Sequence, residues 1–491
     1  MDPRLAAYVT NTDRDVFALR NLPEEVVAVL FAYYSRSRED LRTNLARLLD
    51  DDELDVVAAA PGAALGTAKD KARAFHQKWV VGYGHSSVAE HAVLHLAVER
   101  CSVLAAKALE EARLGAYTEK STRYVRFDEG TLVTDIGLAP PLAREYEAAA
   151  RALLGTYTGL ADRVEAALAL RHPAEPGVNP KAHAASLRTH ACDLLRGLLP
   201  AGVPTNVGMT LNARALEHHI GRLLGSPLHE VRCIGRGLLA EGSVIVPTLL
   251  KYTAPSAHRT GAYDRVKRAH GALHAAPGPR EDALVRLVDL SDAPLRTLAT
   301  AVQCELFGAS WDRAWHAAHD ADHALELVRA YLMERGPHDA PLRALEQVQF
   351  RFEVCCDYGA WRDLQRHRML SATTPRLGVA DGYGVPEDLD ALGFGDEVRA
   401  ALDAVVPTHR LIAAEAPWEA QYVVPLAFRV RWMFQANLRE LFHLTELRSA
   451  RQGHEAYRRV AQAVAKAVTG ACPWLEPHLR VDHASYPFAR H

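Results

Sequence analysis

The sequence lacks the marks of a membrane-spanning or secreted protein. It contains no run of about eighteen apolar residues, which is the length that a transmembrane helix needs. Its first segment, MDPRLAAYVTNTDRD, has neither a basic n-region nor an apolar h-region. We therefore expect no helix that crosses a bilayer and no secretory signal.

Cysteine is scarce. The seven cysteines are scattered and include no C-x-x-C pair. A disulfide framework and a zinc site are therefore not expected, and we predict no metal. Free thiols in an odd number are typical of a reducing compartment, which favours the cytoplasm.

A strong excess of one charge is also missing. The formal net charge is -3, so no global basic field attracts nucleic acid or a membrane surface. Any anion must then be recognised locally, by a few placed arginines. A G-x-G-x-x-G loop after a strand is absent too, so the sequence does not predict a Rossmann domain for FAD. Hydrophobic residues at 49% and charged residues at 24% indicate an ordinary globular protein.

The sequence does contain a duplication. Its length of 491 residues also predicts two or more domains. The segment LLRGLLPAGVPTNVGMTLNARALEHH matches AQYVVPLAFRVRWMFQANLRELFHL. Pro200 precedes Asn212 by the same twelve residues that separate Pro425 from Asn437. Each Asn opens an N-x-R-x-L element. The match is too regular to be chance.

A second correspondence lies upstream of the first. Residues 89–112 align with residues 345–368, and apolar residues in the second copy alternate with polar ones. This is the period of a half-buried strand, followed in both copies by a helix. Each half is therefore predicted to contain a strand, a helix, an anion-binding loop and a long helical region that carries N-x-R. The alternating apolar residues are Val348, Phe350, Phe352 and Val354.

The junction between the halves is also visible. We predict a first repeat at residues 1–262, a linker at 263–282 that ends in PGPRED, and a second repeat at 283–491. ALVRLVDLSDAP reads as a fresh strand and turn after the linker. Amphipathic helices are predicted at 24–35 and 455–468.

Three ordered motifs carry a family resemblance. GHSSVAEH (84–91) precedes a strand and helix, EKSTRY (119–124) follows, and the triplet Arg366-His367-Arg368 ends a predicted helix in the second half. Together with N-x-R, they resemble the flavin-dependent thymidylate synthases, over roughly residues 75–235 and 284–470. The resemblance implies an α+β fold: two homologous domains, each a largely antiparallel sheet packed with helices.

The two halves depart from the family pattern in complementary ways. The first half keeps S-x-R-Y but has Glu110-Glu111-Ala112 in place of the R-H-R triplet. The second half keeps R-H-R but has a shortened loop without S-x-R-Y. Family members are tetramers whose sites lie between subunits, so the resemblance implies one complete nucleotide site between unlike repeats and a reciprocal, inactive one. That site can form within one chain or between two.

The resemblance also assigns roles to individual residues. Arg448, Ser121 and Arg366 are expected to be catalytic. Nucleotide binding is assigned to Glu119, Ser121, Arg123, Arg196, Arg366 and Arg448. Flavin binding is assigned to His85, Ser87, Arg366, His367, Arg368, Asn437, Arg439, His443, Asn212 and Arg214.

The implied reaction is the FAD-dependent methylation of dUMP to dTMP, with methylene-tetrahydrofolate and NADPH as cosubstrates. Two alternatives stay open: methylation of a different uracil nucleotide, and a catalytically silent protein that binds nucleotide and flavin. The expected partner is a small nucleotide, with no nucleic acid polymer and no membrane. A homodimer would supply four repeats and so imitate the family's tetramer.

Overall fold

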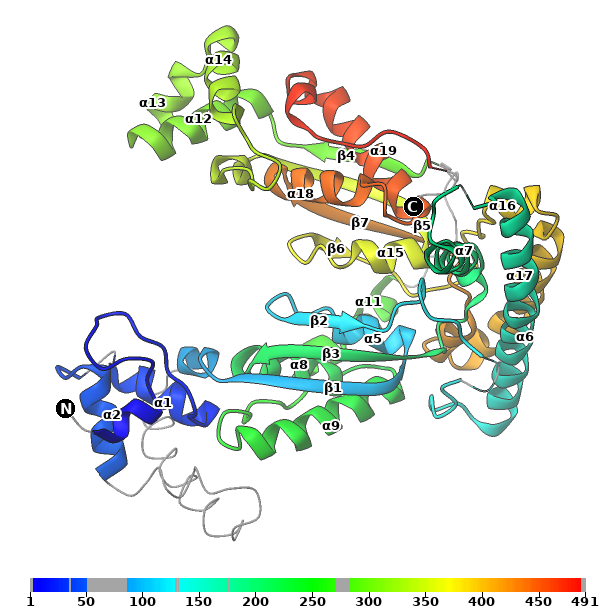
Figure 1. Cartoon of the computed structure of the whole chain (residues 1–491), viewed down its shortest axis with the longest axis horizontal. Coiled ribbons are helices and arrows are strands. Elements are labelled where there is room, and N and C mark those ends of the chain that lie inside the picture. Colours follow the sequence, from blue (N-terminus) through cyan, green and yellow to red (C-terminus); the bar gives the residue numbers. More distant parts are fainter. Residues whose placement is uncertain are drawn as a thin grey trace. The chain divides into compact units, whose positions relative to one another are not determined.

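The computed structural model describes residues 3–34, 37–50, 86–128, 130, 132–174, 176–270 and 283–486. The chain forms two compact units (Figure 1). The first unit comprises Met1–Cys101, Ala108–Glu119 and Thr205–His274, and the second comprises Ser102–Lys107, Lys120–Pro204 and Ala275–His491. Each unit contains one antiparallel sheet with helices, so the chain is α+β with two sheet-and-helix domains, as predicted.

The sheet of the first unit has three strands in the order β1-β3-β2. The strands are β1 (Val93–Ser102), β2 (Ala116–Glu119) and β3 (Pro204–Asn212). Strand β1 leads directly into α5 (Val103–Leu109), which is the predicted strand and helix. The other helices of this unit are α1 (Glu24–Tyr34), α2 (Leu41–Asp50), α8 (Ala213–Leu224), α9 (His229–Ile245), α10 (Ala257–Thr260) and α11 (Ala262–His270).

The sheet of the second unit repeats this order with one strand added. Its order is β4-β5-β7-β6, formed by β4 (Val285–Leu290), β5 (Gln349–Asp357), β6 (Ser371–Thr373) and β7 (Arg429–Asn437). Without β4, the order β5-β7-β6 matches β1-β3-β2, as expected for two copies of one fold. Strand β4 lies where ALVRLVDLSDAP predicted a strand.

The core of this sheet follows from the alternation of apolar residues. Phe350, Phe352 and Val354 are buried on β5, and Phe352 faces Phe434 of β7 with ring centroids 5.2 Å apart. Antiparallel neighbours place such rings on one face, where burial removes them from water.

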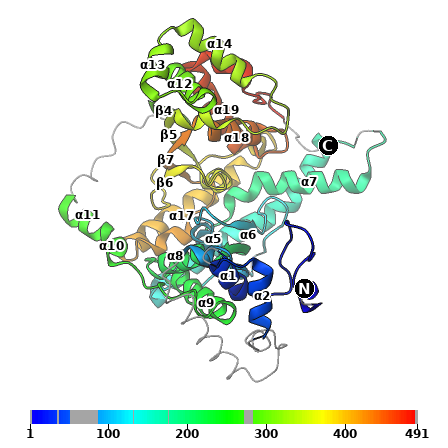
Figure 2. The ribbon, with the colours of Figure 1, turned by 90° about the vertical axis from the view of Figure 1, so that its left-hand side faces the viewer.

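Helices cover this sheet on its buried side. Helix α18 (Leu438–Ser449) packs on α19 (Glu455–Ala471), and α19 contacts β4 and β5. Helices α12 (Pro294–Phe307), α13 (Trp311–Ala317) and α14 (Ala321–Leu332) form a small group beside β4 (Figure 2). Helix α15 (Tyr358–Leu364) follows β5, and Arg366-His367-Arg368 lies just beyond its end.

The N-x-R elements are not inside a long helical region, which corrects that prediction. Asn212 is the last residue of β3 and Asn437 the last of β7, and each then caps a helix. The Asn212 side chain accepts a hydrogen bond from the Ala215 N–H at 2.8 Å, and that of Asn437 accepts one from the Glu440 N–H at 2.9 Å. An Asn satisfies the free N–H groups of a helix start, which explains why both repeats have it there. The preceding residues alternate in burial, so they form strands.

Long helices of both repeats meet within the second unit. Helix α6 (Pro140–Arg171) packs on α7 (Pro180–Leu195) and on α17 (Gly395–Glu415) of the second repeat (Figure 1). Near them, Pro200 and Pro425, the two equivalent prolines, form an antiparallel bridge. Beside it, the Ala201 N–H donates to the Val424 carbonyl at 2.9 Å. Contacts therefore unite parts of both repeats in one unit. The remaining α-helix described in the second unit is α16 (Glu387–Ala391), which packs on α17.

The predicted boundaries at residues 262 and 283 remain a prediction. Helix α11 covers the first part of the predicted linker, and residues 271–282 lie outside the described residues. The amphipathic helices predicted at 24–35 and 455–468 are present as α1 and α19. Within the described part of the chain, no helix is both long and apolar enough to cross a membrane.

Candidate nucleotide site

Asp363 joins arginines of the two repeats inside the second unit. Its Oδ2 accepts a hydrogen bond from Arg196 Nη1 at 3.1 Å, and its Oδ1 lies 3.8 Å from Arg366 Nη2. Arg196 comes from the turn after α7, and Arg366 follows the end of α15. Burial alone would raise the pKa of Asp363, but the guanidinium groups of Arg196 and Arg366 hold it well below its usual range.

Arg123, the arginine of S-x-R-Y, is bound by a second carboxylate. Its Nε and Nη2 atoms donate to the two oxygens of Asp193, each at 2.7 Å. This two-point geometry is the strong form of an arginine–carboxylate pair. Burial raises the pKa of Asp193 and the hydrogen bonds from Arg123 more than reverse this, so the carboxyl is ionised at neutral pH.

Tyr457 of α19 connects Arg123 to Arg448. Arg123 Nη1 donates to the Tyr457 hydroxyl at 3.2 Å. The guanidinium carbons of Arg123 and Arg448 lie 5.8 Å and 5.6 Å from the centre of the Tyr457 ring. Arg123, Arg196, Arg366 and Arg448 thus surround Asp193, Asp363 and Tyr457, and we call these seven residues the arginine cluster.

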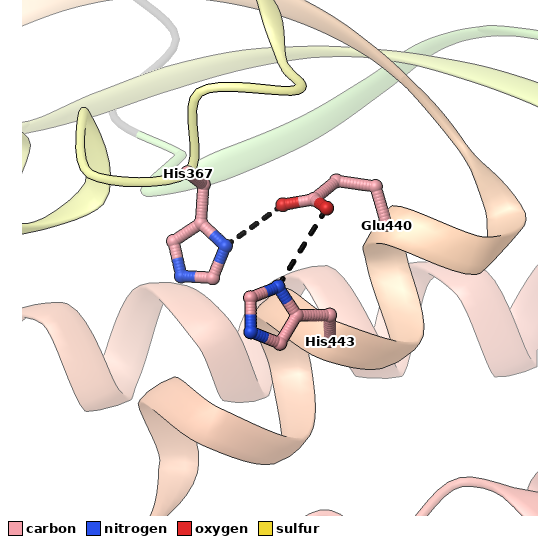
Figure 3. Close-up of side chains that lie close together, drawn as sticks. All are labelled: His367, Glu440 and His443. Atoms are coloured by element: carbon pink, nitrogen blue, oxygen red, sulfur yellow. Dashed lines mark hydrogen bonds and ion pairs between the residues drawn. The ribbon is translucent and has the colours of Figure 1, made fainter. Parts of the chain in front are cut away.

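His367 is held between the carboxylate of Glu440, shown in Figure 3, and the guanidinium of Arg448. Its Nδ1 lies 2.8 Å from Glu440 Oε1, and its Nε2 lies 2.9 Å from Arg448 Nε. His443 Nδ1 approaches the other Glu440 oxygen at 3.6 Å. Burial lowers the pKa of His367, and the Glu440 carboxyl, despite its own burial, has a pKa lowered to about 2 by its hydrogen bonds to His367 and His443.

The same three residues resemble a metal centre in composition. The ligand atoms of His367, Glu440 and His443 lie within 4.8 Å of one another, the one such group among the described residues. However, a ligating imidazole normally donates its second N–H to an acceptor. Here that nitrogen faces Arg448, which is itself a donor. The arrangement is therefore a hydrogen-bond chain.

The remaining residues predicted to bind nucleotide lie on the S-x-R-Y segment. Ser121 is half-buried, and its hydroxyl oxygen accepts a hydrogen bond from the Arg123 N–H at 3.2 Å. Glu119 belongs to the first unit, where it ends β2 and pairs with Val207 of β3.

The residues predicted to bind flavin are dispersed. His367 and His443 lie next to the arginine cluster, while Arg368, which follows His367 in sequence, is half-buried. Arg439 is paired with Glu346 at 2.7 Å. In the first unit, Arg214 is paired with Glu90 and Ser87 is exposed. His85 lies outside the described residues.

A cavity of about 650 Å³ borders the arginine cluster through Asp193 and Arg196. His454 also lines it. Its Nε2 lies 3.2 Å from the Asp193 carbonyl oxygen, and its Nδ1 accepts a hydrogen bond from the Ala456 N–H at 3.1 Å. Burial, reinforced by Arg196, lowers the pKa of His454 to about 3, so this imidazole is neutral.

Four residues that hold the site together were not predicted from the sequence: Asp193, Asp363, Tyr457 and Glu440. A signal existed for two of them, because D-L-L-R (193–196) and D-L-Q-R (363–366) repeat the same pattern. Each Asp lies one helical turn before a predicted site arginine. The pattern does not reveal that Asp363 binds the arginine of the other repeat. Tyr457 and Glu440 have no comparable signal.

Comparison with known proteins supports the duplication. The sequence model of the family described as "Thymidylate synthase complementing protein" matches residues 27–248 and again residues 286–474. The chain belongs to this family. It contains two tandem copies, as the repeated motifs predicted.

Relatives of two kinds are found. The "UPF0159 protein" of Chlamydia muridarum is 35% identical over 99% of this chain and 96% of its own length. "UPF0159 protein Ta1429" of Thermoplasma acidophilum is 29% identical over 85% of this chain and 90% of its own. The "Flavin-dependent thymidylate synthase" of Thermococcus kodakarensis is 30% identical over 36% of this chain and 64% of its own. The first therefore aligns with nearly the whole duplicated chain, the second with most of it, and the third with about one repeat.

Proposed function

We propose that the protein methylates dUMP reductively to dTMP, using FAD, methylene-tetrahydrofolate and NADPH, at a single site built from residues of both repeats. The observation that carries this proposal is the arginine cluster. Arg123 and Arg196 of the first repeat share it with Arg366 and Arg448 of the second. These are the arginines that the complementary losses assign to one site.

The charge of the cluster suits a nucleoside monophosphate. Its four guanidinium groups face the two carboxylates of Asp193 and Asp363, so the net charge of these six groups is +2. A phosphate monoester carries about -1.5 to -2 at neutral pH. Arg196 also has a buried Nη2 atom with no hydrogen-bond partner among the described residues. Such a donor is costly to bury without an acceptor, and a phosphate or uracil oxygen would satisfy it.

The second repeat supplies two side chains that are suited to hold a flavin nucleotide. Arg366 and His443 have side chains that are 50% and 60% exposed, and both are donors beside the cluster. Asn212 and Asn437 already use their side-chain oxygens as helix caps, so Arg366 and His443 are the better candidates to hold it. The flavin, when bound, would supply the hydride transfer that no side chain can perform.

The chain's own residues would then bind and polarise the nucleotide. Arg366 offers an exposed guanidinium for the phosphate or a uracil carbonyl. Arg448, fixed beside Tyr457, would place positive charge near a ring that gains electron density when hydride arrives. Ser121 would add a hydroxyl next to Arg123.

One observation favours a different uracil nucleotide as the alternative acceptor. Arg123 was expected to bind phosphate, but two of its donors are engaged by Asp193. A ligand that places its phosphate elsewhere would leave this pair intact. A panel of uracil nucleotides in a flavin-oxidation assay separates dUMP from the alternative acceptor, since a response to dUMP alone eliminates the alternative.

The test of the proposal is a flavin spectrum titrated with dUMP. We expect bound flavin whose absorbance changes with dUMP, and loss of that change in both Arg123→Ala and Arg366→Ala. Absence of flavin absorbance after FAD is added would contradict the proposal. Binding of both ligands without turnover under reducing conditions would instead indicate the catalytically silent protein.

The assembly and compartment are part of the proposal. We propose a homodimer, which would supply four repeats. Recovery of activity when Arg123→Ala and Arg366→Ala proteins are mixed would place the site between chains. The seven cysteines are all free thiols, which supports a reducing compartment such as the cytoplasm.

A further inference from the structure

Glu440, His367 and Arg448 form a continuous chain of hydrogen bonds whose direction is fixed. Figure 3 shows its first link, between Glu440 and His367. The guanidinium of Arg448 can only donate, so His367 Nε2 must accept at 2.9 Å. A neutral imidazole with an accepting Nε2 carries its proton on Nδ1. That proton points at the Glu440 carboxylate 2.8 Å away, which can only accept.

The chain of hydrogen bonds is buried at one end and reaches the arginine cluster at the other. The side chain of His367 is 1% exposed and that of Glu440 is 10% exposed. Glu440 is anchored because it lies in the first turn of α18, where Asn437 caps the helix. Arg448 lies at the other end of the same helix and contacts the Tyr457 ring. His367 therefore ties the loop after α15 to both ends of α18.

The duplication provides an internal comparison. By alignment of the repeats, Ala215 stands at the position of Glu440, Glu111 at that of His367 and Leu223 at that of Arg448. All three residues of the hydrogen-bond chain are thus replaced together in the first repeat. There Glu111 instead pairs with Arg222. The three residues are present together or absent together, as expected for groups that act as one unit.

We propose that Glu440 is a positioning residue that orients Arg448 through His367. This inference rests on the proposed role of Arg448 in nucleotide binding. Glu440 holds the proton of His367 on Nδ1, and the accepting Nε2 then fixes the Arg448 side chain beside Tyr457. Without Glu440, His367 can take its proton on Nε2, and two donors would then face each other.

The first test needs no ligand. In protein labelled with ¹⁵N-histidine, long-range ¹H–¹⁵N spectra distinguish the Nδ1–H from the Nε2–H tautomer, and His367→Gln assigns the signal. We expect the Nδ1–H form at neutral pH. A doubly protonated His367 or an Nε2–H tautomer would overturn the proposal.

The second test compares variants. Glu440→Ala should shift the His367 tautomer and weaken dUMP binding, measured by calorimetry, by about tenfold or more. Glu440→Gln keeps an acceptor and should retain most of the affinity. His443→Gln is the matched control for the tautomer readout alone, because His443 lies beside Glu440 but has no hydrogen bond to Arg448 among the described residues, and it should keep the tautomer. Unchanged tautomer and affinity in Glu440→Ala would refute the positioning role.

The two tests separate this inference from the proposed function. The tautomer of His367 does not depend on which reaction the protein performs. If the Nδ1–H form is found but dUMP does not bind, the hydrogen-bond chain stands and the proposed substrate is wrong.

Discussion

Arg196 and Asp363 are hydrogen-bonded at 3.1 Å although 167 residues separate them in the chain. Arg196 comes from the first repeat and Asp363 from the second. Both side chains are buried, with exposed fractions of 5% and 14%. The pair therefore joins the two repeats through a contact that water screens weakly.

Removing the carboxylate of Asp363 should destabilise the protein strongly. Asp363→Asn leaves Arg196 and Arg366 without their shared counter-ion, and breaking such a buried pair costs about 3–5 kcal/mol. Urea unfolding measures the loss. The control is Asp390→Asn, whose pair with Arg399 is exposed to water and should contribute far less to stability. Equal losses in the two variants would show that Asp363 is not a buried counter-ion.

A methyl group at Gly359 should disturb the Arg196 side chain. A Cβ there would lie 3.0 Å from Asp357 Oδ1 and 3.2 Å from Arg196 Nη2. We expect Gly359→Ala to weaken dUMP binding in calorimetry, because Arg196 must move from its position on Asp363. Gly237→Ala on α9, where the Cβ meets nothing within 4 Å, should leave binding unchanged. It should stabilise the helix by about 0.5–1 kcal/mol. Undiminished affinity in Gly359→Ala would indicate that Arg196 does not contact the ligand.

Neutralising Asp193 should strengthen nucleotide binding while it weakens the fold. Asp193→Asn removes one negative charge from the cluster and releases the donors of Arg123. We expect a lower Kd for dUMP and a lower free energy of unfolding. Asp162→Asn is the control, since its carboxylate is 88% exposed and pairs with Arg126 outside the cluster. Weaker binding in Asp193→Asn would instead mean that Asp193 orients Arg123 for the ligand.

Stability should fall as the pH drops below about 6.5, in part because of His454. Its pKa is lowered to about 3 in the folded protein, mainly by burial. Between pH 6.5 and 3 the unfolded chain therefore binds a proton that the folded chain does not, which favours unfolding. One such group contributes about 1.4 kcal/mol for each pH unit in this range.

His454→Asn tests this contribution, because Asn can still cap α19 but does not titrate. Urea unfolding at pH 5, 6 and 7 should show a smaller loss of stability in the variant than in the unchanged protein. His219, whose pKa burial also lowers to about 3, should leave part of the loss in place. Identical pH profiles would mean that His454 is already charged in the folded protein.

The strands and helices that the sequence predicted have a common property. Val348 to Val354 alternate strictly, and the segment at 455–468 has a clear helical period, so local pattern and tertiary burial agree. The prediction failed where turn signals were misinterpreted. Asn212 and Asn437 were assigned to helical regions, whereas each ends a strand and caps the next helix. The alternation of Val430, Trp432 and Phe434 was the signal that could have shown this.

The sequence by itself determined that the chain is duplicated and which arginines each copy kept, because repeats and motifs are properties of order along the chain. Only the tertiary structure decided that Asp193 and Asp363 stand among those arginines, and that Asp363 binds Arg196 of the other repeat. It also decided that His367 lies between Glu440 and Arg448. Charge pairing between distant residues depends on distances of about 3 Å, and spacing in sequence does not encode such distances.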